Sequence, residues 1–129
     1  MNRLRFFLIL WGSPMFPDFS QIRIFLRPGN TDMRKAINSL AVMVSEDMQG
    51  DPLSGSLYLF CNKQRKNMKV LYWDRNGFCL WQKKLEKHRF PWPDTEEAAR
   101  ELTREELDML LKGIDFFHAH TKLQYSRVS

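Results

Sequence analysis

An Asn-Gly dipeptide lies between two strand-like runs in the middle of the chain. The runs are Met68 to Asp74 and Phe78 to Lys84, and both are rich in aromatic and aliphatic residues. Asn76-Gly77 between them is typical of a type I′ turn, in which both central residues have a positive φ, so the pattern predicts an antiparallel hairpin. Leu57 to Cys61 is a third strand-like run, followed by a basic loop. The sequence therefore predicts a three-stranded antiparallel meander.

The turn also predicts which residues face each other across the hairpin. With the Asn-Gly pair as its two central residues, Tyr72 opposes Trp81 and Lys69 opposes Lys84. Directly opposed lysines repel each other at a cost of about 0.2 to 1 kcal/mol, and binding of phosphate would offset this repulsion. The alternative is that the lysines protect an edge strand while the aromatic rings pack beneath the N-terminal segment. The face expected to meet the core carries Leu71, Trp73, Phe78 and Leu80.

The first half of the chain predicts a strand and a helix. Ile22 to Leu26 is a short strand-like run that ends at the turn signal Pro28-Gly29-Asn30. We expect Thr31 or Asp32 to cap one long helix that runs to about Met48. The apolar residues that recur at helical spacing in this helix are Met33, Ile37, Leu40, Ala41 and Val44.

The last part of the chain predicts a second helix. Thr103 to Glu106 has the pattern of a capping box, and Gly113 is a typical residue to end the helix that follows. Phe90 to Pro93, which precedes this helix, contains two prolines and cannot continue a β-ladder. The elements indicate an α+β fold: a short N-terminal strand, one long helix, the three-stranded antiparallel meander and a C-terminal helix.

The chain is expected to divide into one domain and two terminal segments. Residues 1–20 predict a flexible N-terminal arm, residues 21–115 a single domain and residues 116–129 a frayed tail. The regular polar and apolar pattern begins only at the first predicted strand. Met15 is therefore a candidate start, which would make residues 1–14 an upstream read-through.

No segment predicts membrane insertion or export. The apolar run Phe6 to Trp11 is too short to cross a membrane, and no small-residue cleavage site follows it. Cys61 and Cys79 both lie in apolar strand-like runs, and two buried thiols suit a reducing compartment. We therefore expect a cytoplasmic protein with no membrane partner.

The charge of the chain is positive and unevenly distributed. The net charge is +5, which favours polyanionic partners such as nucleic acid. Residues 61–90 carry nine cations against two acids, whereas residues 94–111 carry seven acids against two arginines. Arg34 and Lys35 would lie in the first turn of the long helix, where cations oppose the helix dipole; either an anion binds there or both side chains are solvated. The residues predicted to bind nucleic acid, by phosphate contact or base stacking, are Arg34, Lys35, Lys63, Arg65, Lys66, Lys69, Tyr72, Trp81, Lys83, Lys84, Lys87 and Arg89.

The sequence lacks the patterns expected of a catalytic, cofactor or metal site. Two-metal phosphoryl transfer needs several converging carboxylates, yet the middle strands carry only Asp74, beside the turn. The chain has no G-x-x-x-x-G-K-[ST] loop and no G-x-S-x-G turn. His118 and His120 are two residues apart in the tail and far in sequence from both cysteines, so they predict no zinc site. We expect a protein that is not an enzyme and binds no cofactor.

Several long motifs follow one another in a fixed order. They are Thr31–Lys35, Asp51–Gly55, Lys69–Phe78, Arg89–Pro93 and Leu102–Asp115. In sequence and order they resemble the TnpB accessory proteins of the insertion-sequence-sixty-six transposon family, and the resemblance covers about Ile22 to Asp115. This TnpB differs from the RNA-guided nuclease of the same name, whose metal-binding carboxylates and zinc ribbon have no counterpart here.

The resemblance implies a role in moving an insertion sequence. The expected partners are transposon DNA, a DDE-type transposase that performs strand transfer, and a small helix-turn-helix-like protein of the same element. The expected function is that of a non-catalytic accessory factor that contacts DNA through its basic strand region. The alternative is a protein–protein adaptor that binds the transposase through its aromatic sheet face and acidic C-terminal helix, without touching DNA.

Overall fold

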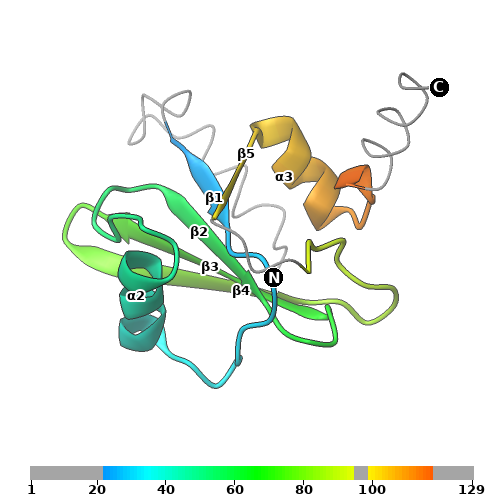
Figure 1. The fold of residues 1–129 in the computed structure, drawn as a ribbon, viewed down its shortest axis with the longest axis horizontal. Coiled ribbons are helices and arrows are strands. Elements are labelled where there is room, and N and C mark those ends of the chain that lie inside the picture. The colour runs from blue at the N-terminus through cyan, green and yellow to red at the C-terminus, as the bar shows by residue number, and fades with distance from the viewer. Residues whose placement is uncertain (1–21, 95–98, 118–129) are drawn as a thin grey trace.

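The computed structural model describes residues 22–94 and 99–117, in which a five-stranded sheet carries a helix on each face (Figure 1). The strands lie in the order β4-β3-β2-β1-β5. β1 pairs in parallel with β2, and the other neighbouring pairs are antiparallel. The α+β class is confirmed. The elements are β1 (Ile24–Leu26), α2 (Ile37–Glu46), β2 (Leu57–Cys61), β3 (Asn67–Asp74), β4 (Gly77–Lys84), β5 (Arg100–Leu102) and α3 (Arg104–Leu111).

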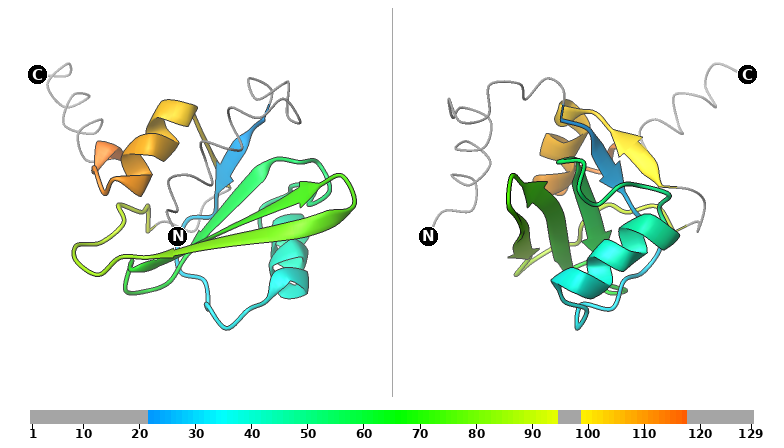
Figure 2. Two further views of the ribbon diagram at one scale, coloured as in Figure 1. Left: turned by 180° about the vertical axis from the view of Figure 1, so that it is seen from behind. Right: turned by 90° about the vertical axis from the view of Figure 1, so that its left-hand side faces the viewer.

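The two helices cover opposite faces of the sheet, because successive side chains of a strand point to opposite faces. In β2, Tyr58 belongs to a buried cluster with Leu40 of α2. The next residue, Leu59, belongs to a second cluster with Leu107 of α3. Figure 2 shows one helix on each side of the sheet. Every residue of β2 is consequently buried, so the core of the domain lies on both faces of its central strand.

The predicted meander is part of a larger, mixed sheet. β2, β3 and β4 are antiparallel neighbours, but β1 lies parallel to β2, with Ile24 opposite Leu57. α2 connects these two strands, as a crossover between parallel strands requires. The sequence pattern does not predict β5, whose three residues include one buried apolar side chain, Leu102. β5 pairs with β1, and the Arg23 guanidinium donates two hydrogen bonds, of 2.8 and 2.9 Å, to the Glu101 carboxylate.

The predicted start of the long helix at residues 31–32 is wrong. α2 begins at Ile37, without a side-chain cap. The Asp32 carboxylate instead accepts the backbone N–H of Arg34 at 2.9 Å, a local turn that competes with helix formation. Lys69 Nζ also donates a 2.8 Å hydrogen bond to the carbonyl of Met33. In a helix that began earlier, this oxygen would instead accept the backbone N–H of Ile37.

The hairpin forms in a different register from the one predicted. Its two-residue loop is Arg75-Asn76, and only the first of these two has a positive φ, 55°, so the turn is not type I′. Lys69 opposes Gln82 and Lys84 opposes Asn67, so the predicted pairing of the two lysines is wrong. Because the register moves by two residues, each side chain stays on its predicted face of the sheet.

The C-terminal helix begins as predicted. Thr103 Oγ1 accepts the N–H of Glu106 at 3.1 Å, and the Glu106 carboxylate accepts the N–H of Thr103 at 2.9 Å, which completes a capping box. Phe116, just beyond the predicted domain, is also buried. The predicted arm and the paired histidines of the tail lie outside the described residues, at 1–20, His118 and His120.

Candidate nucleic-acid interface

Two loops lie side by side at one end of the sheet (Figure 1). The first, residues 62–66, connects β2 to β3, and the second, residues 85–94, follows β4. The N–H of Leu85 donates to the Lys66 carbonyl at 2.8 Å, and the N–H of Phe90 donates to the Arg65 carbonyl at 2.7 Å. Chain segments that are about twenty residues apart in sequence thus form one surface. We call this surface the basic end, and it presents Lys63, Lys66, Lys84, Lys87 and Arg89.

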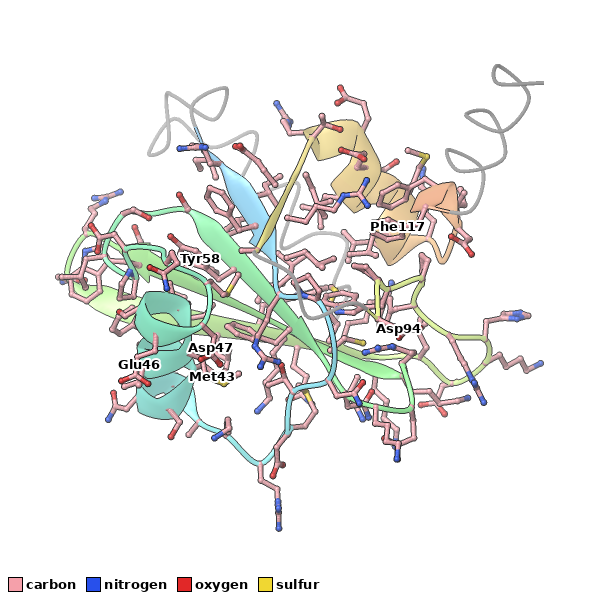
Figure 3. The ribbon with its side chains drawn as sticks, in the orientation of Figure 1. Met43, Glu46, Asp47, Tyr58, Asp94 and Phe117 are labelled. Carbon is pink, nitrogen blue, oxygen red and sulfur yellow. The ribbon has the colours of Figure 1, made fainter. Side chains whose placement is uncertain are left out.

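Arg65 ties the basic end to the rest of the domain. Its guanidinium donates to the carbonyls of Gly29 and Asn62, both at 3.1 Å, and to the Asp94 carboxylate at 2.6 Å. Figure 3 labels Asp94, where the chain leaves the second loop. The Arg65 side chain is only 12% exposed. It therefore holds three segments together and is not available for phosphate, although the sequence analysis predicts it as a DNA contact.

The aromatic residues of the second loop anchor it to the core. Phe90 and Trp92 are buried, and the indole N–H of Trp92 donates to the Arg27 carbonyl at 2.9 Å. The carbonyl of Pro93 accepts the N–H of Gly29 at 2.9 Å. The Phe-Pro-Trp-Pro motif thus has a structural role, and it fixes the position of the charged residues that precede it.

The cations of the basic end point into solvent. Lys63, Lys84, Lys87 and Arg89 are exposed. Within residues 22–94 and 99–117, no hydrogen bond or ion pair joins these four side chains to another residue. The two loops contain two acids. Asp94 is paired with Arg65, and Glu86 has no ion-pair partner within the described residues. A surface of this kind attracts polyanions. Its cations displace the counterions around the phosphates, and the release of these counterions favours binding.

Arg34 lies beside the first loop, in the turn before α2, and Lys35 faces a different hollow beside α2. The N–H of Thr31 donates to the Cys61 carbonyl at 2.8 Å, and a shallow hollow of about 580 Å³ lies between residues 30–34 and 62–64. The Arg34 guanidinium donates to both oxygens of Asp32, and these hydrogen bonds lower the pKa of the Asp32 carboxyl to about 2. The Arg34 charge is thus partly compensated, although its side chain is 91% exposed.

Four other predicted contacts have structural roles. Lys69 is buried and its ammonium also donates to the Lys35 carbonyl at 3.0 Å. Lys83 Nζ donates to the Leu111 carbonyl at 3.1 Å, at the C-terminal end of α3, where a cation is favourable. Tyr72 and Trp81 are buried in the cluster beneath α3. Burial also raises the pKa of the Tyr72 phenol.

Asn62 shapes the first loop, a role that the charge and strand patterns do not indicate. Its side-chain oxygen accepts the N–H of Lys66 at 3.0 Å and the N–H of Asn67 at 3.1 Å. Asparagine is typical of turns for this reason, and its place directly after the third strand-like run was an available signal.

The comparisons with known proteins agree with the sequence motifs. The sequence model of the family described as "IS66 Orf2 like protein" matches residues 22–121. The chain belongs to this family. It is 38% identical over 104 residues to the uncharacterized protein y4hO of Sinorhizobium fredii (strain NBRC 101917 / NGR234). The aligned residues cover 81% of this chain and 90% of that protein. It is 29% identical over 101 residues to the uncharacterized protein y4jC of the same strain, covering 78% and 86%.

Family membership associates the chain with the transposition machinery of an insertion sequence, in an accessory role. No solved structure matches it with significance. In residues 22–94 and 99–117, no helix is long and apolar enough to span a membrane, and no group of three His, Cys, Asp or Glu side chains could hold a metal ion.

Proposed function

We propose that the protein is a non-catalytic accessory factor of transposition that contacts the DNA of its element through the basic end. The observation that supports this most is the juxtaposition of two loops and the end of β4. Together they present four exposed cations that have no partner in the described residues: Lys63, Lys84, Lys87 and Arg89. Two of the acids near these cations pair with other groups, Asp94 with Arg65 and Asp32 with Arg34. Glu86 is the one acid within the two loops that has no ion-pair partner in the described residues, so the cations outnumber the free acids there.

The spatial arrangement also narrows the predicted DNA-binding set. Lys69 and Arg65 are used inside the fold, and Lys83 bonds to the end of α3. Arg34 extends the basic end along the turn before α2, across the hollow that Lys63 also lines. Lys35 lines a different hollow, beside α2. The proposed contact surface therefore lies mainly on loops, with Lys84 at the end of β4 as its one strand residue.

A matched pair of variants tests this proposal. Lys63→Gln/Lys87→Gln removes two cations from the basic end, and Arg75→Gln/Lys112→Gln removes two cations elsewhere, so both variants have the same net charge. Affinity for a fluorescent duplex from the end of the element is measured by anisotropy across a salt series. We expect only the first variant to weaken binding, with the log–log salt slope smaller by about 2, or about 1 per lost phosphate contact. Equal weakening by both variants, or no binding by the wild type, would contradict the proposal.

The alternative function is an adaptor that binds the DDE transposase. The aromatic sheet face predicted for this role is buried beneath α3. A second surface favours protein contact: Val42 of α2 is 52% exposed and lies at a hollow of about 460 Å³. Met43, Glu46 and Asp47, which Figure 3 labels at α2, also line this hollow. Capture of purified transposase by the wild type, lost in Val42→Asp and kept in Lys63→Gln/Lys87→Gln, would support the adaptor function.

A further inference from the structure

We infer that the basic end binds the sugar-phosphate backbone of duplex DNA, and not single strands or particular base sequences. This inference rests on the proposed function and specifies the form of DNA that the same surface takes. Three features of the described residues carry it: where the aromatic rings lie, which cation types are exposed, and how rigidly the two loops are joined.

The Phe and Trp rings near the basic end are buried. Phe90 is 2% exposed, Trp92 8% and Trp81 9%. Surfaces that hold single strands without sequence preference combine cations with exposed rings, on which the unpaired bases stack. Among the described residues, the basic end has cations but no exposed Phe, Tyr or Trp ring beside them, and its one exposed aromatic side chain is the imidazole of His88. This single small ring offers much less stacking area than the larger rings of such surfaces, so the basic end favours a duplex over unpaired bases.

The cations that remain exposed are mostly lysines. Lys63, Lys84 and Lys87 are exposed, and Arg89 is the one exposed arginine of the two loops. Lysine acts as a point charge, whereas the planar arginine fork gives the two-bond contact that identifies guanine in the major groove. The other arginine of the loops, Arg65, is bound to Gly29, Asn62 and Asp94 inside the fold. The surface therefore suits phosphates and offers little for base recognition.

The backbones of the two loops are joined, which keeps the bases of their charged side chains close together. Backbone hydrogen bonds join the loops at Leu85 and Phe90, and Arg65 fixes the first loop to the exit of the second. A compact cluster of cations releases the most counterions from the ligand with the densest charge. Duplex DNA carries about one charge per 1.7 Å of axis, and a single strand about half that density.

The test compares three fluorescent probes on the full chain: a 20-base-pair duplex from the element end, its isolated top strand, and a duplex of scrambled sequence. We expect the two duplexes to bind with affinities within about threefold of each other, and at least about tenfold more tightly than the single strand at low salt. With four cations engaged, the duplex salt slope should be about −3 to −4, from roughly −0.9 per phosphate.

Three results would count against this inference, and they separate it from the proposed function. Single-strand binding as tight as duplex binding would overturn the duplex preference and leave DNA contact intact. A preference above about tenfold for the element end over the scrambled duplex would overturn backbone binding in favour of base recognition. Failure to bind any of the three probes would overturn the proposed function, and the inference with it.

Discussion

The Arg65 guanidinium lies 2.6 Å from the Asp94 carboxylate, although the two residues are 29 positions apart in the chain. Arg65 also has a positive φ of 63°, a conformation that is strained for any residue with a side chain. The strain is tolerated because the resulting turn aims the guanidinium at Gly29, Asn62 and Asp94 together. The basic end is therefore organised by a charged residue that is not itself exposed to a partner.

The role of Arg65 predicts a specific order of stabilities. Arg65→Ala should lower the free energy of unfolding by about 1 to 3 kcal/mol, because hydrogen bonds to a charged group are lost. Arg65→Gly loses the same bonds but removes the strain of a positive φ, so it should be more stable than Arg65→Ala by about 1 kcal/mol. Urea unfolding measures both values. If the two variants are equally stable, the positive φ at this position does not persist in solution.

Two adjacent lysines of β4 should have opposite effects. Lys83→Gln removes the 3.1 Å hydrogen bond to the Leu111 carbonyl at the end of α3. We expect it to lower the free energy of unfolding by about 0.5 to 2 kcal/mol and to leave the salt dependence of DNA binding unchanged. Lys84→Gln, on the other face of the strand, should leave stability unchanged and reduce the salt slope by about 1.

The measurements for this pair are urea unfolding and anisotropy with the same duplex. Each variant serves as the control for the other, because both remove one lysine from the same strand. A reduced salt slope in Lys83→Gln would show that its ammonium leaves α3 to meet phosphate. Reduced stability in Lys84→Gln would show that this exposed side chain has a packing role.

The stability of the protein at acidic pH should depend on Asp32. Hydrogen bonds from Arg34 lower the pKa of Asp32 to about 2 in the folded protein, below its ordinary value of 3.8. A carboxyl whose pKa is lowered by folding contributes stability that is present above its unfolded pKa and is lost as the pH falls through its folded pKa. The wild type should therefore lose stability between about pH 4 and pH 2, and Asp32→Asn should lose less over the same window.

The denaturation midpoint in urea, measured at intervals from pH 5 to pH 2, tests this expectation. Glu86→Gln is the control, because Glu86 is an exposed acid whose side chain makes no hydrogen bond within the described residues. A profile for Asp32→Asn that is parallel to the wild type throughout would show that the bond to Arg34 does not form in solution.

The sequence predicts the helices and strands of this fold better than the contacts between residues that are far apart in the chain. The three strands of the meander, the faces of the hairpin and the Thr103 cap follow from local patterns, and all of these are found. The start of α2 does not follow from such patterns. It depends on Lys69, which reaches the turn from a strand more than thirty residues later. β5 likewise exists through its pairing with β1 and through Arg23 and Glu101, which are 78 residues apart.

The candidate site was predictable as a region but not in its members. The excess of cations between residues 61 and 90 includes the two loops that form the basic end. Period-two patterning cannot say that helices cover both faces of the sheet, so it does not reveal that Tyr72 and Trp81 are buried. It also cannot distinguish Lys84, which is exposed, from Lys83, which reaches the end of α3.

The last prediction concerns how α3 is held on the sheet. The capping box joins Thr103 and Glu106 through two hydrogen bonds of 3.1 and 2.9 Å. Thr103→Ala should therefore lower the free energy of unfolding by about 0.5 to 2 kcal/mol, whereas Thr103→Ser keeps an oxygen acceptor and should stay within about 0.5 kcal/mol of the wild type. Urea unfolding gives both values.

Thr103→Ala should also change the surroundings of Trp81. Leu107 and Leu110 of α3 cover the buried cluster that contains this ring. If the first turn of α3 opens, hydrogen exchange should rise at the amides of Leu107 to Leu110 before the whole protein unfolds, since local opening then costs less than global unfolding. Affinity for duplex DNA should not change, because no hydrogen bond or ion pair in the described residues joins the exposed lysines of the basic end to α3. A lower DNA affinity in Thr103→Ala, with wild-type affinity in Thr103→Ser, would show that the DNA-binding surface includes α3 as well as the basic end.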